Sequence, residues 1–120
     1  RRADKLAGLV AEVEAAGASC IAVALDVADA AAVTACFDEI AQRATGPADI
    51  VINNAGVTVT KPLLQQTEAD WDTVVGTNLK GSWLVAQEAA RRLVAAGSGG
   101  SIVNIASILA ERVLGLPRSR

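Results

Sequence analysis

The chain has 120 residues, a net charge of −2 and three aromatic residues, Phe37, Trp71 and Trp83. A chain of this length forms at most one domain. The charge and the few aromatic side chains argue against a nucleic-acid partner, which needs a basic surface or a stacking platform. No apolar run is long enough to span a membrane, and Arg1-Arg2 is not followed by a signal-peptide apolar region.

Two cysteines, Cys20 and Cys36, are too few for a disulfide framework and are interpreted as buried thiols of a cytoplasmic protein. The chain contains no histidine and no tyrosine. This leaves lysine and the carboxylates as the strong acid–base candidates. It also excludes a histidine-based catalytic triad and a Cys/His metal site, so no metal is expected.

Hydrophobic periodicity predicts strands that alternate with helices along the chain. The expected elements are a helix through residues 6–13 that stops near Gly17, a strand at 20–25, a helix at 29–44, a strand at 49–52, a helix from about residue 68 to 96 with an interruption near Gly76, and a strand at 101–107. The strands are uninterrupted apolar runs, which indicates a parallel sheet covered by helices on both faces. We therefore expect a doubly wound α/β fold.

Polar residues stand at the end of each expected strand. They are Asp26, the pair Asn53-Asn54, and Ser107. Because ligands of such sheets bind outside the carboxyl ends of the strands, these groups are expected to converge on one edge. The two asparagines are the least expected, since an amide is costly to bury unpaired.

A further asparagine, Asn78, interrupts an apolar stripe on the long helix. The stripe consists of Trp71, Val74, Val75, Ser82, Val85, Ala86 and Ala89. An asparagine on a buried stripe needs a specific partner. The alternative is a local bond from its side chain to the backbone, without a chemical role.

Three motifs occur in a fixed order: "NNAG" at 53–56, "NLKG" at 78–81 and "GGSIVNIAS" at 99–107. In these motifs the chain resembles the middle part of a compact short-chain dehydrogenase/reductase. The resemblance implies a partial NAD(P)-binding Rossmann-like domain over residues 1–120. It also implies hydride transfer between nicotinamide and a small carbonyl or alcohol substrate, of the 3-oxoacyl, sugar or alcohol type.

The resemblance also implies roles for individual residues. Asp26 and the amide of Val27 match the pair that contacts adenine, and Ala55 and Gly56 match the stretch under the adenosine ribose. Asn53 matches the asparagine that ties the central strands together and is counted with the cofactor-binding residues.

The catalytic residues implied by the resemblance are Asn78 and Ser107. The backbone of Asn78 would hold a water in a proton relay, and Ser107 would hydrogen-bond the substrate oxygen. Arg1 and Arg2 would follow the strand that selects the cofactor, which favours NADP, with NAD possible. A solvated basic start of a helix is the alternative interpretation of this pair.

Two family features are absent from these 120 residues. The glycine-rich phosphate loop would precede residue 1, and the Tyr-x-x-x-Lys motif would lie beyond the chain. The "GSGGS" at 97–101 is no substitute, because it follows a helix and enters a strand. Lys61 and Lys80 do not stand in the missing motif. We therefore expect an inactive fragment with a gap in its sheet, since two strands belong between 20–25 and 49–52.

Two alternative functions differ from an enzyme. One is a non-catalytic module that binds a nicotinamide nucleotide, which absence of a downstream Tyr-x-x-x-Lys would favour. The other is a phosphoacceptor domain using Asp26, which would need acids and a lysine at the other strand ends. A second apolar row on the long helix indicates assembly, and the family resemblance implies a homodimer or homotetramer of the full-length protein. It consists of Leu79, Trp83, Ala86, Ala90 and Val94.

Overall fold

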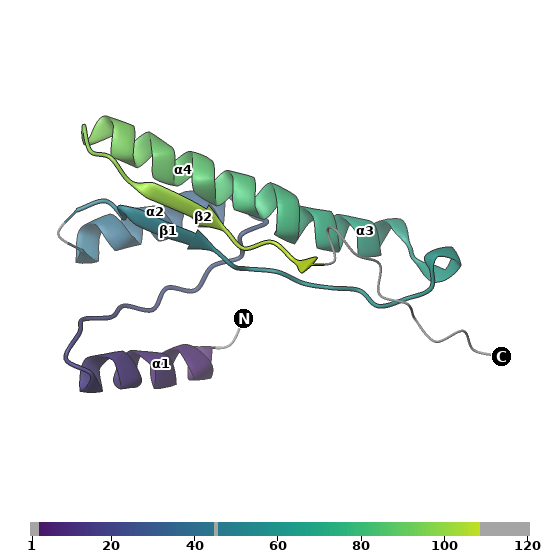
Figure 1. Ribbon diagram of the computed structural model, residues 1–120, viewed down its shortest axis with the longest axis horizontal. Helices are drawn as coiled ribbons and strands as arrows, with labels where there is room; N and C mark the ends of the chain where they lie inside the picture. Colours follow the sequence, from purple (N-terminus) through teal and green to yellow (C-terminus); the bar gives the residue numbers. More distant parts are fainter. Residues whose placement is uncertain (1–2, 45, 109–120) are drawn as a thin grey trace.

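A computed structural model describes residues 3–44 and 46–108 (Figure 1). Its elements are α1 (Ala3–Ala15), α2 (Ala30–Arg43), β1 (Ile50–Asn53), the short 3₁₀ helix η1 (Leu63–Gln65), α3 (Glu68–Val75), the π-helix η2 (Gly76–Gly81), α4 (Ser82–Ala95) and β2 (Ser101–Asn104). None of the helices described is long and apolar enough to cross a membrane.

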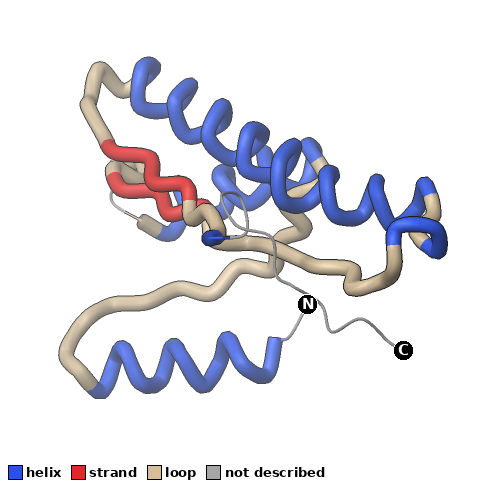
Figure 2. The backbone as a smooth tube through the Cα atoms, turned by 45° about the vertical axis from the view of Figure 1, so that its right-hand side comes forward, coloured by secondary structure: helices blue, strands red, loops and turns tan. Residues whose placement is uncertain are grey.

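The sheet has two parallel strands, β1 and β2, with Val51 opposite Ile102 and Asn53 opposite Asn104. Helices α2 and α4 pack on each other, and α4 packs on β1 (Figures 1 and 2). The core between them consists of Val33, Phe37, Val51, Val85 and Ala89. This arrangement is part of a parallel α/β fold, as the sequence predicts.

The opposite face of the sheet is bare in the described part of the chain. Ile50 and Ile52 are 66% and 62% exposed, whereas Val51 between them is buried. The prediction of strands buried on both faces is wrong for these residues. The cause is that α2 and α4 share one face, while α1 stands apart from the sheet in both views (Figures 1 and 2).

The expected strand at 20–25 is absent, and this prediction is also wrong for the described residues. This segment runs between α1 and α2 without strand pairing. A strand exists only through ladder bonds to a neighbour, and no described strand lies beside it. Leu25 at its end and Val27 just after it still pack against the core.

The predicted helix boundaries are confirmed by their caps. Asp29 caps α2 by accepting from the backbone N–H groups of Ala31 and Ala32. Thr67 and Asp70 form a complete capping box at the start of α3. The chain turns after α1 at Gly17, where φ is +85° and favours glycine.

Cys36 is buried in α2, as expected, and burial raises the pKa of its thiol. Cys20 is only half-buried. Both are free cysteines. A buried thiol with a raised pKa is a poor nucleophile, which agrees with a structural role for Cys36.

Arg92 connects α4 to α2. Its guanidinium contacts the Asp38 carboxylate at 2.8 Å, donates to the largely buried Glu88 at 2.9 Å, and lies 5.6 Å from the centroid of the Phe37 ring. Hydrogen bonds from Arg92 to Asp38 and Glu88 raise the pKa of the guanidinium. The cation thus satisfies a buried carboxylate and joins two helices.

Replacing Arg92 by methionine is expected to lower the free energy of unfolding by about 1–2 kcal/mol, because Glu88 would keep its buried charge without its main partner. Arg91 is the matched control, since it is exposed and reaches Glu88 only at 3.5 Å. R91M should cost less than about 0.5 kcal/mol. Urea denaturation of the complete protein, followed by circular dichroism, measures both, and equal losses would contradict the assignment.

Candidate functional site

The carboxyl ends of β1 and β2 meet at one edge of the sheet (Figure 1). The backbone N–H of Ile105 donates to the carbonyl of Asn53 at 2.9 Å, so the pairing continues just past the strands. The segments that begin at Asn54 and Ile105 therefore leave the sheet side by side. Of the predicted site residues, Ala55 and Gly56 lie on the first segment and Ser107 lies on the second.

Asn53 is buried, and both N–H groups of its amide have acceptors. Its Nδ2 donates to the backbone carbonyl of Ser82 at 3.1 Å and to Oδ1 of Asn104 at 2.9 Å. These bonds tie β1 to β2 and to the start of α4, which agrees with the role of a strand-tying asparagine. Asn53 does not line the cavity that contains the other predicted cofactor residues, so direct contact with a cofactor stays a prediction.

A cavity of about 320 Å³ lies beside this edge. It is lined by Leu25, Asp26, Val27, Ala55, Gly56, Val57 and Thr77. Four residues that the sequence assigns to the cofactor thus come together, although 26 and 55 are far apart in the chain. Asp26 is exposed, and its Oδ1 accepts from the backbone N–H of Ala28 at 3.1 Å, which fixes the carboxylate at the rim.

Two glycines shape this cavity. A Cβ at residue 56 would meet only Oδ1 of Asn78, at 3.7 Å, so the backbone of Gly56 faces open space that a flat ligand could approach. A Cβ at residue 81 would lie 2.7 Å from Cγ2 of Val27. Gly81 therefore lets the end of the π-helix pack directly on Val27. The open space at Gly56 and the Asp26 carboxylate at the rim fit an adenosine group.

Sequence reasoning missed four residues of this region: Leu25, Val57, Thr77 and Gly81. Val57 and Thr77 directly follow and precede residues of the recognised motifs, and Gly81 is the last letter of "NLKG". Their position beside the motifs was the available signal. Arg1 and Arg2 lie outside the described residues, so their predicted part in cofactor choice stays a prediction.

Asn78 lies in the π-helix η2, at the interruption expected near Gly76. Its Oδ1 accepts from the N–H of Val57 and its Nδ2 donates to the carbonyl of Val57, both at 2.9 Å. The partner predicted for the Asn78 side chain is therefore the backbone of Val57, 21 residues earlier in the chain. The alternative of a local bond from this side chain is not what the structure shows.

The predicted burial of the Asn78 stripe is wrong for Asn78 and Trp71, which are both exposed. The prediction assumed uninterrupted α-helical spacing from residue 71 to residue 89. A π-helix inserts one residue into the turn and rotates the rest of the helix, so residues 71 and 85 no longer share a face. Val85 and Ala89 after the π-helix are buried as expected.

A second cavity, of about 460 Å³, lies between η2, α4 and the end of β2. Its lining includes Asn78, Asn104, Ile105 and Ala106. Ser107 follows Ala106 directly and is exposed. The two predicted catalytic residues are thus found near the same cavity. Asn78 lies between this second cavity and the cavity that contains Asp26.

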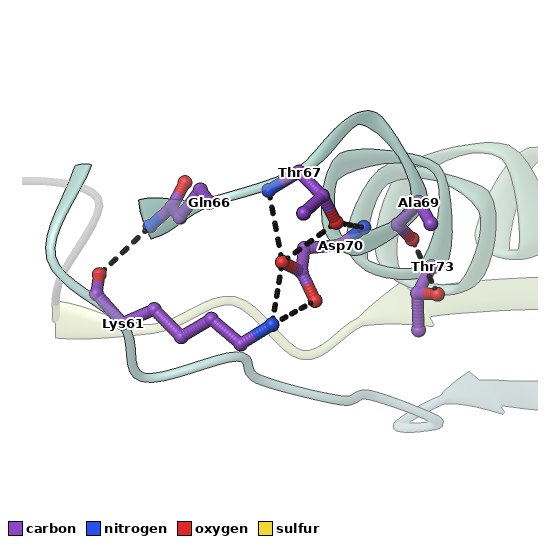
Figure 3. A network of polar contacts seen from close by, with 6 residues as sticks. All are labelled: Lys61, Gln66, Thr67, Ala69, Asp70 and Thr73. Carbon is purple, nitrogen blue, oxygen red and sulfur yellow. Dashed lines mark hydrogen bonds and ion pairs between the residues drawn. The ribbon is translucent and has the colours of Figure 1, made fainter. Parts of the chain in front are cut away.

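Asp70 anchors a third group of polar contacts beyond the site (Figure 3). Its carboxylate accepts from Lys61 Nζ at 2.7 and 2.8 Å and from the N–H and hydroxyl of Thr67 at 2.9 Å. These hydrogen bonds, the one from Lys61 first, lower the pKa of Asp70 to about 2. The sequence predicts a helix start near residue 68 but does not reveal the contact with Lys61.

The parallel strands with α2 and α4 on one face, and cavities at the carboxyl ends of the strands, define part of a Rossmann-like α/β fold. The sequence matches the short chain dehydrogenase family over residues 1–116. The chain belongs to this family of oxidoreductases.

Individual relatives agree with this assignment. The chain is similar to (3R)-3-hydroxyacyl-CoA dehydrogenase of Canis lupus familiaris, with 40% identity over 106 residues, which is 88% of this chain and 41% of the relative. It is similar to 3-oxoacyl-[acyl-carrier-protein] reductase of Staphylococcus aureus, with 35% identity over 88% of this chain and 42% of the relative.

A solved structure with the same fold is gluconate 5-dehydrogenase from Burkholderia cenocepacia J2315 in complex with NADP and tartrate. The TM-score is 0.82 at 36% identity, and the match covers 95% of this chain and 44% of that one. The chain therefore spans about two fifths of the length of the relatives it matches.

The tie made by Asn53 can be tested with Asn54 as the matched control. N53D should lower the free energy of unfolding by about 1–3 kcal/mol, because a carboxylate oxygen would replace the donor that faces the Ser82 carbonyl. Asn54 is exposed, so N54D should have little effect. Chemical denaturation of both variants of the complete protein measures this difference, and equal stabilities would refute the tie.

Proposed function

We propose that the complete protein is an NAD(P)-dependent oxidoreductase that interconverts a carbonyl and an alcohol on a small substrate. The observation that carries this proposal is the gathering of Asp26, Val27, Ala55 and Gly56 around one cavity next to Asn78. The similar hydroxyacyl-CoA and oxoacyl enzymes support a 3-oxoacyl-type substrate. Similarity to gluconate 5-dehydrogenase supports a sugar-type substrate as the second choice.

The cofactor is proposed to be NADP, with NAD as the alternative. Asp26 would accept from the exocyclic amine of adenine, and Ala55 and Gly56 would let the ribose approach the backbone closely. Arg1 and Arg2 would favour a 2′-phosphate through their charge. When bound, the cofactor supplies or accepts the hydride.

The chain's own residues would hold the substrate and move the proton. Ser107 would donate a hydrogen bond to the substrate oxygen and stabilise negative charge on it. The backbone of Asn78 would hold a water of the proton relay, while its side chain is engaged with Val57. The proton donor would be a tyrosine contributed by sequence beyond these 120 residues, so the fragment alone would be inactive.

The deciding experiment uses the complete protein with NADPH and a 3-oxoacyl thioester. S107A should lower kcat at least about 100-fold, because a donor to the developing oxyanion is lost. The dissociation constant for NADPH should stay unchanged. Ser101, at the start of β2, is the matched control, and S101A should keep full activity. Turnover by S107A equal to that of the wild type would refute the catalytic role.

A non-catalytic nucleotide-binding module is the second candidate. The same experiment separates the two functions. A complete protein that binds NADPH but turns over none of the offered carbonyl or alcohol substrates, and that lacks a downstream Tyr-x-x-x-Lys, would be such a module.

We also propose that the full-length protein is a homo-oligomer assembled through α4. Four residues of the second apolar row are exposed, which is unfavourable for apolar side chains in water, and Ala86 is half-buried. The exposed residues are Leu79, Trp83, Ala90 and Val94. A partner copy would remove this surface from solvent.

W83E should dissociate the oligomer, because a carboxylate would be buried in the apolar contact. Trp71 is the matched control, since it is 67% exposed on α3 while Trp83 is 56% exposed on α4. W71E should leave the assembly intact. Light scattering of both variants at several concentrations decides, and an unchanged oligomer in W83E would exclude this helix as the interface.

A further inference from the structure

The segment 57–66 connects the end of β1 to α3 and has little apolar packing of its own. Its two large apolar residues in η1, Leu63 and Leu64, are 81% and 97% exposed. In the absence of buried side chains, polar contacts must hold such a segment in place.

Two polar anchors hold this segment, and both come from one continuous helical run. Asn78 in η2 binds the backbone of Val57 through a donor and an acceptor, each at 2.9 Å. Asp70 in α3 binds Lys61 Nζ through both carboxylate oxygens, at 2.7 and 2.8 Å (Figure 3). Gln66 adds a bond to the Lys61 carbonyl at 3.1 Å.

The start of this segment separates two cavities. Val57 lines the cavity that contains Asp26 and Gly56. The next residues, Thr58 and Val59, line a different cavity of about 230 Å³, together with Asp70 and Trp71. Residues 57–59, named the wall below, therefore border both the candidate cofactor cavity and the Asp70 cavity.

We propose that the Lys61–Asp70 ion pair is a clasp that holds this wall in place, and that Lys61 and Asp70 are positioning residues for cofactor binding. The pair acts through the 57–59 wall on the cavity of Asp26 and Gly56, and not by touching the cofactor. The part of this inference that concerns cofactor binding rests on the proposed function.

The geometry favours a clasp over a direct phosphate ligand. Both oxygens of Asp70 are used by Lys61, and the Asp70 side chain is only partly accessible to water. The hydrogen bond from Lys61 is also the largest cause of the low pKa of Asp70. The Asp70 carboxylate thus stays ionised at neutral pH, and the clasp is closed under ordinary conditions.

The first arm of the test measures amide hydrogen exchange at residues 57–59 of the complete protein without nucleotide. K61M and D70N should each raise exchange there by roughly threefold to fivefold, the scale expected for loss of one partly exposed ion pair. K61R keeps the charge and should retain most of the protection. K61M leaves the Thr67–Asp70 capping box untouched, so the test stands even if D70N fails to fold.

The second arm measures the dissociation constant for NADPH by calorimetry. K61M and D70N should weaken binding by similar factors of roughly threefold to fivefold, and the double variant should be no weaker than either single one. The matched control is K80M, which removes the same charge from an exposed lysine that has no hydrogen bond or ion pair with the described residues.

The outcomes separate the possible roles. Tighter NADPH binding by D70N, or equal weakening by K61M and K80M, would mean that lysine charge acts on the cofactor directly and would overturn the proposal. Unchanged exchange at 57–59 in both variants would overturn the clasp itself. If the wild type binds no NADPH, the proposed function and the cofactor arm fail, while the exchange data still decide whether the clasp exists.

Discussion

The buried amide of Asn53 is the constraint on which the edge of the sheet depends. Its two N–H groups meet two acceptors, one on the neighbouring strand and one at the beginning of α4. An unpaired amide in this position would carry a desolvation penalty, so β1, β2 and α4 can meet only in an arrangement that supplies both acceptors. The position of the cavities at this edge therefore depends on the two hydrogen bonds donated by Asn53.

The π-helix extends the same constraint toward the loop after β1. It begins at Gly76 and ends at Gly81, one residue before the Ser82 carbonyl that Asn53 holds. Within it, Asn78 binds the backbone of Val57. Asn53 thus fixes the chain before Ala55 and Gly56, and Asn78 fixes it after them by binding Val57. Ala55 and Gly56 have little or no side chain with which to form such contacts themselves.

Local signals in the sequence were sufficient for the helix boundaries. The helix starts near residues 29 and 68 and the stop near Gly17 are found where the sequence predicts them. Asp29, Thr67 and Gly17 fix these ends through contacts or dihedral angles within a few residues. Asp26 is found beside Ala55 and Gly56, as expected for groups at strand ends, although residues 20–25 form no strand in the described part of the chain.

Features that depend on distant partners were not predictable in the same way. The run at 20–25 has every property of a strand except a neighbour, and without one it forms no ladder. The alternation of Ile50, Val51 and Ile52 reflects which face α4 covers, which no single strand encodes. The pairing of Lys61 with Asp70 depends on how a connecting segment folds back, and sequence spacing does not reveal that path.

The separation of Asn53 from Asn104 has a consequence for the order in which the chain acquires structure. The two residues are 51 positions apart, so their pairing cannot begin on the ribosome until α3, α4 and β2 have been synthesised and released from the exit tunnel. Until then the Asn53 amide is hydrated and β1 has no strand to join. Nascent β1 therefore stays unpaired until nearly all of these 120 residues have been made.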